Sequence, residues 1–222
     1  MFYIERVIQV EDRKISMAVV RRLPRYYRYL GNLLDNGVTK ISSKELSDRM
    51  KVTASQIRQD LNNFGGFGQQ GYGYNVEYLY EEIGKILGLN RVYKMVLIGA
   101  GNLGQALANY TAFNKRGFEL VGIFDVNPKI VGLSIRGVEV LDIDSLENFV
   151  KTHDIDIAIL ATPKQGVEEI ASNLSTWGVR GIWNFSSEDL LCAEGILVEN
   201  VNLSQSLMTL AYQIHSEGNK SL

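Results

Sequence analysis

The chain has very few cysteine and histidine residues, the residue types on which disulfides, thiol chemistry and zinc sites depend. Cys192 is the one cysteine among 222 residues, so no intramolecular disulfide can form. A reducing cytoplasm is therefore the expected compartment. The two histidines, His153 and His215, lie far apart in the sequence, and no Cys/His cluster accompanies them. Because zinc sites need several such ligands close together, no metal site is expected.

Long apolar runs are also missing. No stretch approaches the roughly 18 apolar residues that suggest a membrane helix, so no membrane partner is expected. The N-terminus carries Glu5 and Glu11 among its apolar residues, which does not match a secretory signal. The length instead suits two domains. We place the segments at 1–90, 91–202 and 203–222, the last being a C-terminal helix and tail.

Basic residues are concentrated near the N-terminus, although the whole chain has a net charge of −2. Between Arg13 and Arg58 there are eleven Lys or Arg residues and three Asp or Glu residues. Such a local excess of positive charge is typical of a surface that binds a polyanion. A solvated basic face is the alternative, and the charge alone leaves the two open.

Helix signals in the same region form a helix-turn-helix pattern. Three helices are expected: 24–34, starting at Pro24; a short one ending near Met50, capped by Ser42 or Ser43; and 54–64, capped by Thr53. Ile57, Leu61 and Phe64 share the apolar side of the third helix. Its other side offers hydroxyl, amide and guanidinium groups near the helix start, which can read base edges and phosphates in a major groove. The predicted DNA contacts on it are Ser55, Gln56, Arg58 and Gln59.

A glycine-rich stretch, 65–74, follows the third helix and contains five glycines in ten residues. It cannot hold a helix, but it can form a thin β-hairpin, the wing of a winged helix, that approaches a phosphodiester backbone closely. Gln69, Gln70, Gly71 and Tyr72 are its predicted DNA contacts. A flexible linker is the alternative. We expect a further helix over 75–88, and residues 1–16 to be poorly ordered or a short appended helix.

A short apolar strand, 94–98, leads into three glycines with the spacing G-x-G-x-x-G: Gly99, Gly101 and Gly104. A strand, then this turn, then a helix is the order that binds a dinucleotide pyrophosphate through backbone N–H groups. A second strand ends at Asp125, 21 residues past Gly104, where a carboxylate would accept hydrogen bonds from an adenosine ribose and repel a 2′-phosphate. This pattern favours NAD(H). The predicted contacts in the turn are Gly99, Ala100, Gly101, Asn102, Leu103 and Gly104.

The rest of the chain alternates strands and helices, which predicts a Rossmann-type parallel sheet. Further strands are expected near 118–124, 138–140, 156–160, 180–185 and 196–200, with helices near 102–115, 144–151 and 165–177. Ligands bind at the C-terminal strand ends of such sheets. The predicted contacts there are Ala161, Thr162, Pro163 and Phe185. Phe185, Ala161 and Pro163 would form an apolar pocket that favours the neutral dihydronicotinamide of NADH over the charged ring of NAD⁺.

A last helix from about Leu203 to Ile214 carries a broad apolar stripe that must be buried. A DNA reader of this kind is usually a two-fold dimer, which favours a subunit interface over packing on the chain's own sheet. An NAD-dependent dehydrogenase with a basic appendage is the main alternative function, and Lys164 is then the best general acid or base. A CoA-binding or other nucleotide module is a third interpretation. No convincing catalytic group converges on the crevice, so we expect no enzyme activity.

The order of these motifs resembles the family of redox-sensing transcriptional repressors Rex. The matching stretches include the wing, the GAGNLG turn and the segments 22–28, 43–46, 57–60, 124–125 and 181–185, spanning about 22–203. The resemblance implies a homodimer, with the C-terminal helix exchanged between subunits, that binds operator DNA and releases it when NADH binds. Wings of this family often carry Lys or Arg where this chain has Gln69 and Gln70. DNA affinity would therefore depend on Arg22, Arg25, Lys51 and Arg58.

Overall fold

The structure is a computed structural model that describes residues 8–10, 13–64, 68–69, 73–163, 166–191 and 195–218. The chain divides into two compact units, residues 1–90 and 91–222. Within the described residues, no helix is both long and apolar enough to cross a bilayer. Each unit has its own hydrophobic core, so each is described by itself.

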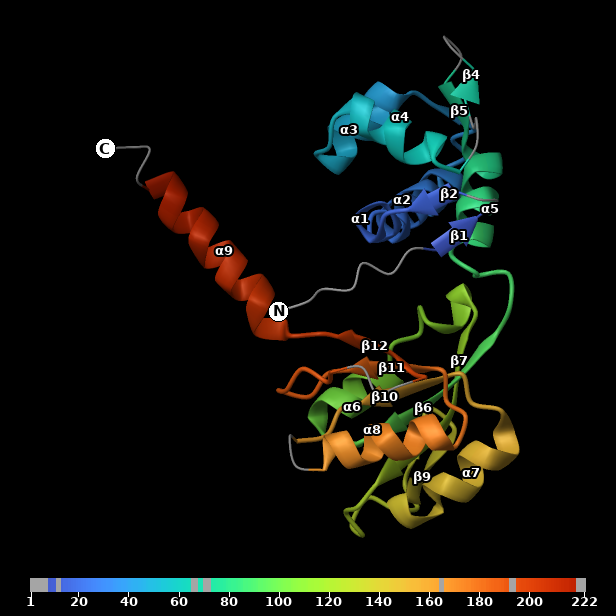
Figure 1. The fold of residues 1–222 in the computed structure, drawn as a ribbon, viewed down its shortest axis with the longest axis vertical. Coiled ribbons are helices and arrows are strands. Elements are labelled where there is room, and N and C mark those ends of the chain that lie inside the picture. Colours follow the sequence, from blue (N-terminus) through green and yellow to red (C-terminus); the bar gives the residue numbers. More distant parts are fainter. Residues whose placement is uncertain are drawn as a thin grey trace. The chain divides into compact units, whose positions relative to one another are not determined.

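The first unit is a set of helices with two small antiparallel sheets (Figure 1). Its elements are β1 (Ile8–Val10), β2 (Arg13–Ile15), α1 (Met17–Val20), α2 (Leu23–Asp35), β3 (Lys40–Ile41), α3 (Ser43–Met50), α4 (Ala54–Asn62), β4 (Gly68–Gln69), β5 (Gly73–Asn75) and α5 (Val76–Ile86). β1 and β2 pair antiparallel. The expectation of a disordered segment or a helix before Ser16 is therefore wrong for these residues. β-branched side chains favour strands, and Ile8 and Val10 of β1 pair with Ile15 and Arg13 of β2.

Capping side chains fix the starts of α3, α4 and α5, and the sequence predicts the first two of these caps. Ser42 forms a capping box with Glu45, in which each side chain bonds the other's backbone N–H at 3.1 and 2.8 Å. Thr53 caps α4 through the Gln56 N–H, and Asn75 caps α5. α2 begins with Pro24 in its first turn, where a missing N–H costs nothing. α4 ends at Asn62, two residues earlier than predicted.

The predicted wing is confirmed where the structure describes it. β4 and β5 pair antiparallel, and β3 adds to the other edge of β5, so the sheet order is β3-β5-β4. Gln70, Gly71 and Tyr72 lie outside the described residues, and Gln69 is described in its backbone only. The core beneath this sheet contains apolar side chains from every helix between α2 and α5, including Leu23, Tyr26, Leu46, Ile57 and Leu79.

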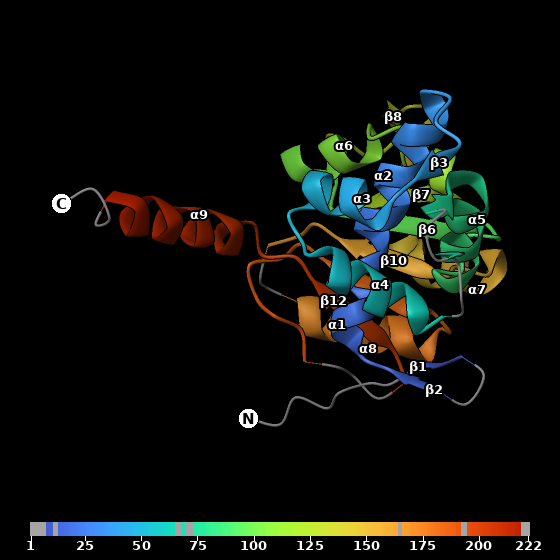
Figure 2. The same ribbon diagram turned by 90° about the horizontal axis from the view of Figure 1, so that it is seen from above.

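The second unit is built on a seven-stranded sheet (Figure 2). Its strands are β6 (Tyr93–Ile98), β7 (Phe118–Asp125), β8 (Ser134–Ile135), β9 (Val138–Asp142), β10 (Ile157–Leu160), β11 (Gly181–Asn184) and β12 (Leu197–Asn200), in the order β12-β11-β10-β6-β7-β9-β8. All pairings are parallel except that of β8 with β9. The predicted parallel sheet is confirmed, and the antiparallel edge strand β8 was not foreseen.

Helices cover both faces of this sheet. They are α6 (Asn102–Ala108), α7 (Leu146–His153) and α8 (Val167–Thr176). Val96 and Ile98 of β6 pack in the same core cluster as α7 and α8, whereas Met95 and Leu97 pack with Ala108 of α6. Alternate residues of a strand point to opposite faces, so the continuous apolar run in β6 reflects burial on both sides.

α6 is shorter than the predicted helix over 102–115. It ends at Ala108, and the chain continues through turns into a short 3₁₀ helix, Asn114–Arg116. At the helix end, the Gln105 carbonyl oxygen accepts both the backbone N–H of Asn109 at 3.0 Å and its side-chain amide at 2.8 Å. Phe113 then packs against Trp183 of β11, with ring centroids 5.6 Å apart. Tertiary packing of this aromatic residue therefore overrides a local pattern that would allow a longer helix.

α9 (Leu203–Gly218) follows β12 after two residues. Its large apolar side chains are more than half exposed on this chain: Leu203, Leu207, Met208, Leu210, Tyr212 and Ile214. The predicted apolar stripe is present, and nothing in the described chain covers it.

Candidate nucleotide crevice and DNA-reading helix

The three glycines of the turn after β6 differ in what a side chain at each position would contact. Gly99 has φ +96°, and a Cβ there would lie 2.7 Å from the Ala161 carbonyl oxygen. A Cβ on Gly104 would overlap the Gly99 carbonyl oxygen. Around Gly101, by contrast, a Cβ would meet nothing within 4 Å. Two of the glycines therefore allow the protein to pack on itself, and the middle one leaves its backbone open to an approaching ligand.

Asp125 lies at the C-terminal end of β7 and is tied to the glycine turn. Its carboxylate accepts the Ala100 N–H at 2.6 Å and the Asn127 N–H at 2.8 Å. Gln105 donates to the Ala100 carbonyl oxygen from the other side at 2.8 Å. A carboxylate has about four acceptor positions, so two backbone bonds fix its orientation and leave capacity for ribose hydroxyls.

A cavity of about 180 Å³ lies at the C-terminal ends of β6, β7 and β10. Six predicted nucleotide contacts line it: Gly99, Gly101, Asp125, Ala161, Thr162 and Pro163. Ala100, Asn102, Leu103, Gly104 and Phe185 do not line it. The Thr162 hydroxyl is buried with no hydrogen-bond partner in the described structure. Because an unpaired buried hydroxyl costs free energy, this one is suited to a ligand's polar group.

Five cavity residues were not foreseen from the sequence: Ile98, Phe124, Val126, Ile143 and Ile170. Ile98 is the last residue of β6 and Phe124 the last but one of β7, so their position near the ends of two neighbouring strands was the signal that could have found them. Ile143 and Ile170 come from a 3₁₀ turn and from α8, and only the fold brings them to the cavity. They make its walls largely apolar.

Phe185 follows β11, and its N–H donates to the Leu160 carbonyl oxygen at 2.8 Å. Its ring is half-buried and packs edge-on against Trp183, with centroids 4.6 Å apart. It therefore lies at the correct end of the sheet, two strands away from Gly99 in the sheet order. Lys164, the candidate acid or base of a dehydrogenase, lies outside the described residues, as does Cys192.

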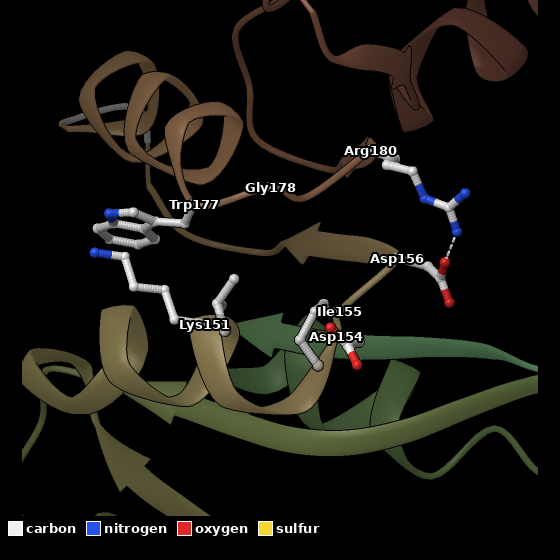
Figure 3. Close-up of a pocket in the computed structure, with 8 residues that line it drawn as sticks. Lys151, Asp154, Ile155, Asp156, Trp177, Gly178 and Arg180 are labelled. Atoms are coloured by element: carbon white, nitrogen blue, oxygen red, sulfur yellow. Dashed lines mark hydrogen bonds and ion pairs between the residues drawn. The ribbon is translucent and has the colours of Figure 1, made fainter.

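A second, larger hollow of about 310 Å³ lies before the N-terminal end of β10 (Figure 3). Asp156 at its edge forms ion pairs with Arg180 and with Arg91, the latter at 2.9 Å, and accepts the Lys94 N–H at 3.0 Å. These bonds hold the starts of β6, β10 and β11 together. Ligands of parallel sheets bind at the opposite ends of the strands, so this hollow is not the nucleotide site.

The exposed side of α4 presents the predicted DNA-reading groups. Ser55, Arg58 and Gln59 are exposed, as are Arg25 and Lys51. The Arg58 guanidinium donates to the Ser43 hydroxyl of α3 at 3.1 Å, which ties the two helices of the helix-turn-helix at their surface. Within the described part of the chain, the side chains of Ser55 and Gln59 have no hydrogen-bond partner, so both are available.

Arg22 and Gln56 are engaged inside the protein. Both bond the carboxylate of Asp60, which is fully buried in α4. Arg22 donates from Nε and Nη2, each at 2.6 Å, and Gln56 donates from Nε2 at 2.8 Å. The Tyr26 hydroxyl donates to the same carboxylate at 2.7 Å. The Arg22 side chain is 31% exposed, so its main observed role is to pair with Asp60 rather than to present a free guanidinium.

This shell of donors controls the ionisation of the cluster. Burial alone would raise the pKa of Asp60, but the hydrogen bonds from Arg22, Tyr26 and Gln56 outweigh it and hold the pKa below its ordinary value. Burial, together with the bond to Asp60, raises the pKa of the Tyr26 hydroxyl. Asp60 is therefore a carboxylate at neutral pH. Sequence reasoning missed this role, although an acid between Ile57 and Leu61 on an apolar helix face was a usable signal.

Comparisons with known proteins cover both units. Residues 14–62 match a family model described as "Putative DNA-binding protein N-terminus", and residues 90–188 match one described as "CoA binding domain". The redox-sensing transcriptional repressor Rex of Clostridioides difficile is 62% identical over 90% of this chain and 96% of its own length. The chain belongs to the Rex family. Rex of Thermoanaerobacter pseudethanolicus is 59% identical over 92% of this chain and 91% of its own length.

Solved Rex-family structures have the same fold. RSP, a Rex-family repressor, in complex with β-NAD⁺ and operator DNA is 56% identical, with a TM-score of 0.86 over 95% of this chain and 97% of that one. RSP in complex with β-NADH is 54% identical, with a TM-score of 0.86 over 93% and 97% of the two chains. The predicted winged helix followed by a Rossmann-type domain is confirmed. Because the relatives are named repressors, they favour the regulator over the dehydrogenase.

Proposed function

We propose that this chain is a cytoplasmic transcriptional repressor that binds double-stranded, two-fold symmetric operator DNA and leaves it when NADH occupies the crevice of the second unit. One observation carries the proposal: a capped helix-turn-helix and an open dinucleotide turn occur in one chain whose Rex relatives match both. Each binding unit then influences the other through a coupling free energy, which is a differential affinity for two states of the protein.

The crevice fits a dinucleotide without NADP's 2′-phosphate. Gly101 would admit a pyrophosphate close to the backbone, and Asp125 would accept bonds from the ribose hydroxyls while repelling a 2′-phosphate. Thr162 offers a buried hydroxyl with no partner in the described structure. The proposed nucleotide contacts remain Gly99, Ala100, Gly101, Asn102, Leu103, Gly104, Asp125, Ala161, Thr162, Pro163 and Phe185.

The preference for NADH over NAD⁺ rests on the apolar side chains of this region. Phe185, Ala161 and Pro163 would surround the nicotinamide end, and a positive ring loses more hydration there than a neutral one. Discrimination therefore requires no acid, base or nucleophile from the chain, only poor hydration of the pocket. NADH is a sensed ligand in this proposal and is not consumed.

The DNA surface combines phosphate contacts with base reading. Arg25, Lys51 and Arg58 are exposed cations on or beside the helix-turn-helix. Lys and Arg contacts to phosphates give a salt-dependent affinity, whereas neutral side chains give little salt dependence. The proposed contacts are Arg22, Arg25, Lys51, Ser55, Gln56, Arg58, Gln59, Gln69, Gln70, Gly71 and Tyr72, with Arg22 acting mainly through Asp60.

A homodimer explains the exposed stripe of α9. Six large apolar side chains of this helix are uncovered on one chain, and a second copy of the same helix can bury them reciprocally. We propose that α9 is exchanged between the two subunits. A dimer would also present two α4 helices, as the two half-sites of a palindromic operator require.

The decisive experiment is a titration of operator DNA at several NADH/NAD⁺ ratios. A duplex containing an inverted repeat, selected by this protein from random sequence, should shift at low salt. NADH should abolish the shift at concentrations at which NAD⁺ does not. Equal potency of the two nucleotides would contradict redox sensing, and failure to select any duplex would contradict the repressor function.

The match to a CoA-binding model makes CoA the second ligand to examine. CoA carries a 3′-phosphate on its ribose, which would lie near the carboxylate of Asp125 and be repelled. Titration of CoA against bound NADH separates the two ligands. Displacement by CoA at lower concentrations than NAD⁺ would assign the crevice to CoA.

A further inference from the structure

The carboxylate of Asp60 is fully saturated with donors. Its Oδ2 accepts from Arg22 Nε and from the Tyr26 hydroxyl, and its Oδ1 accepts from Arg22 Nη2 and from Gln56 Nε2. Four donors thus occupy the four acceptor positions of one buried carboxylate. Because this carboxylate is buried and held at several points, it fixes the orientation of the side chains that donate to it.

The bond to Asp60 determines which way the Gln56 amide points. An ionised carboxylate only accepts hydrogen bonds, so the amide must turn its NH₂ group toward Asp60 and its Oε1 away. The flipped amide would place two acceptors against each other. The usual ambiguity between amide oxygen and nitrogen is therefore removed by chemistry.

The fixed amide keeps an acceptor and a donor for a partner outside the protein. Oε1 has no donor among the described residues, and one of the two Nε2 hydrogens remains unused after the bond to Asp60. Gln56 is half-buried in the first turn of α4, the part of a recognition helix that contacts base edges. An oxygen acceptor beside an N–H donor is the pair that matches N6 and N7 of adenine in the major groove.

We propose that Gln56 is a base-specificity residue that reads one adenine in each half-site of the DNA, with its amide held in the reading orientation by Asp60. This inference rests on the proposed DNA-binding function. Arg22 and Tyr26 are then positioning residues, since they hold Asp60 rather than contacting the base.

Gln59 provides the matched comparison on the same helix. It is also a glutamine, it is exposed, and its side chain has no hydrogen-bond partner in the described structure. Its amide can present either edge, and ordering it on DNA costs rotamer entropy that the fixed Gln56 amide has already lost on folding. Gln56 should therefore discriminate bases more sharply than Gln59.

The test is an atom-by-atom scan of DNA. A duplex selected from random sequence by the protein is remade with 7-deazaadenine at each adenine of a half-site in turn, which removes N7 but keeps base pairing. At one position the wild-type protein should lose affinity by about fivefold or more, as expected for a lost hydrogen bond. If no adenine position changes affinity by more than about twofold, the proposal is overturned.

Two variants then assign the effect. Gln56→Met keeps the side chain's length but removes both polar groups, and it should bind the normal and modified duplexes equally, whereas Gln59→Met should still lose affinity at the sensitive position. An equal loss in wild type and Gln56→Met would overturn the assignment to Gln56. Far-ultraviolet circular dichroism of both variants shows that they fold. Failure of the wild type to bind the unmodified duplex would be failure of the proposed function instead.

Discussion

Arg22, the residue just before α2, and Asp60 of α4 form a two-point ion pair between residues 38 positions apart, with both N–O distances at 2.6 Å. Asp60→Asn removes the charge and leaves donors without their acceptor. We expect it to lower the stability of the first unit by about 2–3 kcal/mol. Both tryptophans, Trp177 and Trp183, lie in the second unit. In thermal unfolding followed by circular dichroism at 222 nm, the variant should therefore show a first-unit transition at a lower temperature than wild type. The transition followed by tryptophan fluorescence should not change.

Asp60→Asn should also change how the stability of the first unit falls at low pH. The pKa of Asp60 is lowered in the folded protein, so its contribution is complete above the ordinary carboxyl pKa of about 4 and is lost as pH falls through the lower folded value. Wild type should lose stability in the first unit over that window, and Asp60→Asn should show a flatter profile. Parallel acid limbs for the two proteins would contradict the cluster's role.

Gly101 and Gly104 make a matched pair of alanine substitutions. A Cβ at Gly104 collides with the Gly99 carbonyl, so Gly104→Ala should destabilise the second unit by about 2–3 kcal/mol. A Cβ at Gly101 meets no protein atom, so Gly101→Ala should fold normally yet bind NADH about tenfold or more weakly, because the Cβ occupies the pyrophosphate's path. Thermal unfolding and NADH fluorescence titration measure the two effects. Normal NADH binding by Gly101→Ala would show that the pyrophosphate does not bind beside Gly101.

Asp125→Asn tests the choice of nucleotide. The amide keeps an acceptor for the Ala100 N–H or the Asn127 N–H but removes the negative charge that would repel a 2′-phosphate. NADH affinity should fall by about tenfold, whereas NADPH affinity should fall less or rise. Calorimetric titration of both nucleotides gives the ratio. If the ratio of NADH to NADPH affinity were identical to that of wild type, Asp125 would have no role in recognising the ribose.

Arg58→Ala should weaken operator binding by about 1–3 kcal/mol and, if the residue contacts a phosphate, reduce the salt slope by about one. Ser43→Ala is the control, because it removes the 3.1 Å bond to Arg58 and keeps the guanidinium charge. Both variants should bind NADH like wild type, since the crevice lies in the other unit. If Ser43→Ala weakened DNA binding as much as Arg58→Ala, the hydrogen bond between Arg58 and Ser43, rather than the charge of Arg58, would be what DNA binding requires.

Leu207→Asp places a charge on the exposed stripe of α9, where Leu207 is 66% exposed on one chain. Burial of that charge against a second copy is unfavourable, so the variant should be a monomer of about 25 kDa and lose affinity for the inverted repeat. Gln205→Asp on the same helix adds the same charge at a polar position. Light scattering of both variants separates an interface effect from a charge effect.

Local signals in the sequence predicted most of the fold. Ser42, Thr53 and Asn75 start their helices because each side chain bonds a nearby N–H, a relationship that extends over only three residues. The glycine turn was equally predictable. The structure shows a steric reason for a glycine at Gly99 and at Gly104, whereas a side chain at Gly101 would contact no protein atom.

Relationships between distant residues could not be predicted. The early end of α6 depends on Phe113 packing against Trp183, and the donors to Asp60 include residues 34 and 38 positions away. No pattern in hydrophobicity reports such a partner. Gln56 was therefore predicted as a DNA contact from its helix position alone, and its fixed amide became visible only through Asp60.

The uncovered stripe on α9 means that DNA binding should depend on the concentration of the chain, because two chains must meet to bury it. If the operator-bound form requires two chains, the number of functional repressors rises faster than the number of chains whenever monomers predominate. Halving the synthesis of the chain would then remove more than half of the dimers. The supply of DNA-binding dimers would therefore respond to gene dosage more steeply than in proportion, on top of any response to NADH.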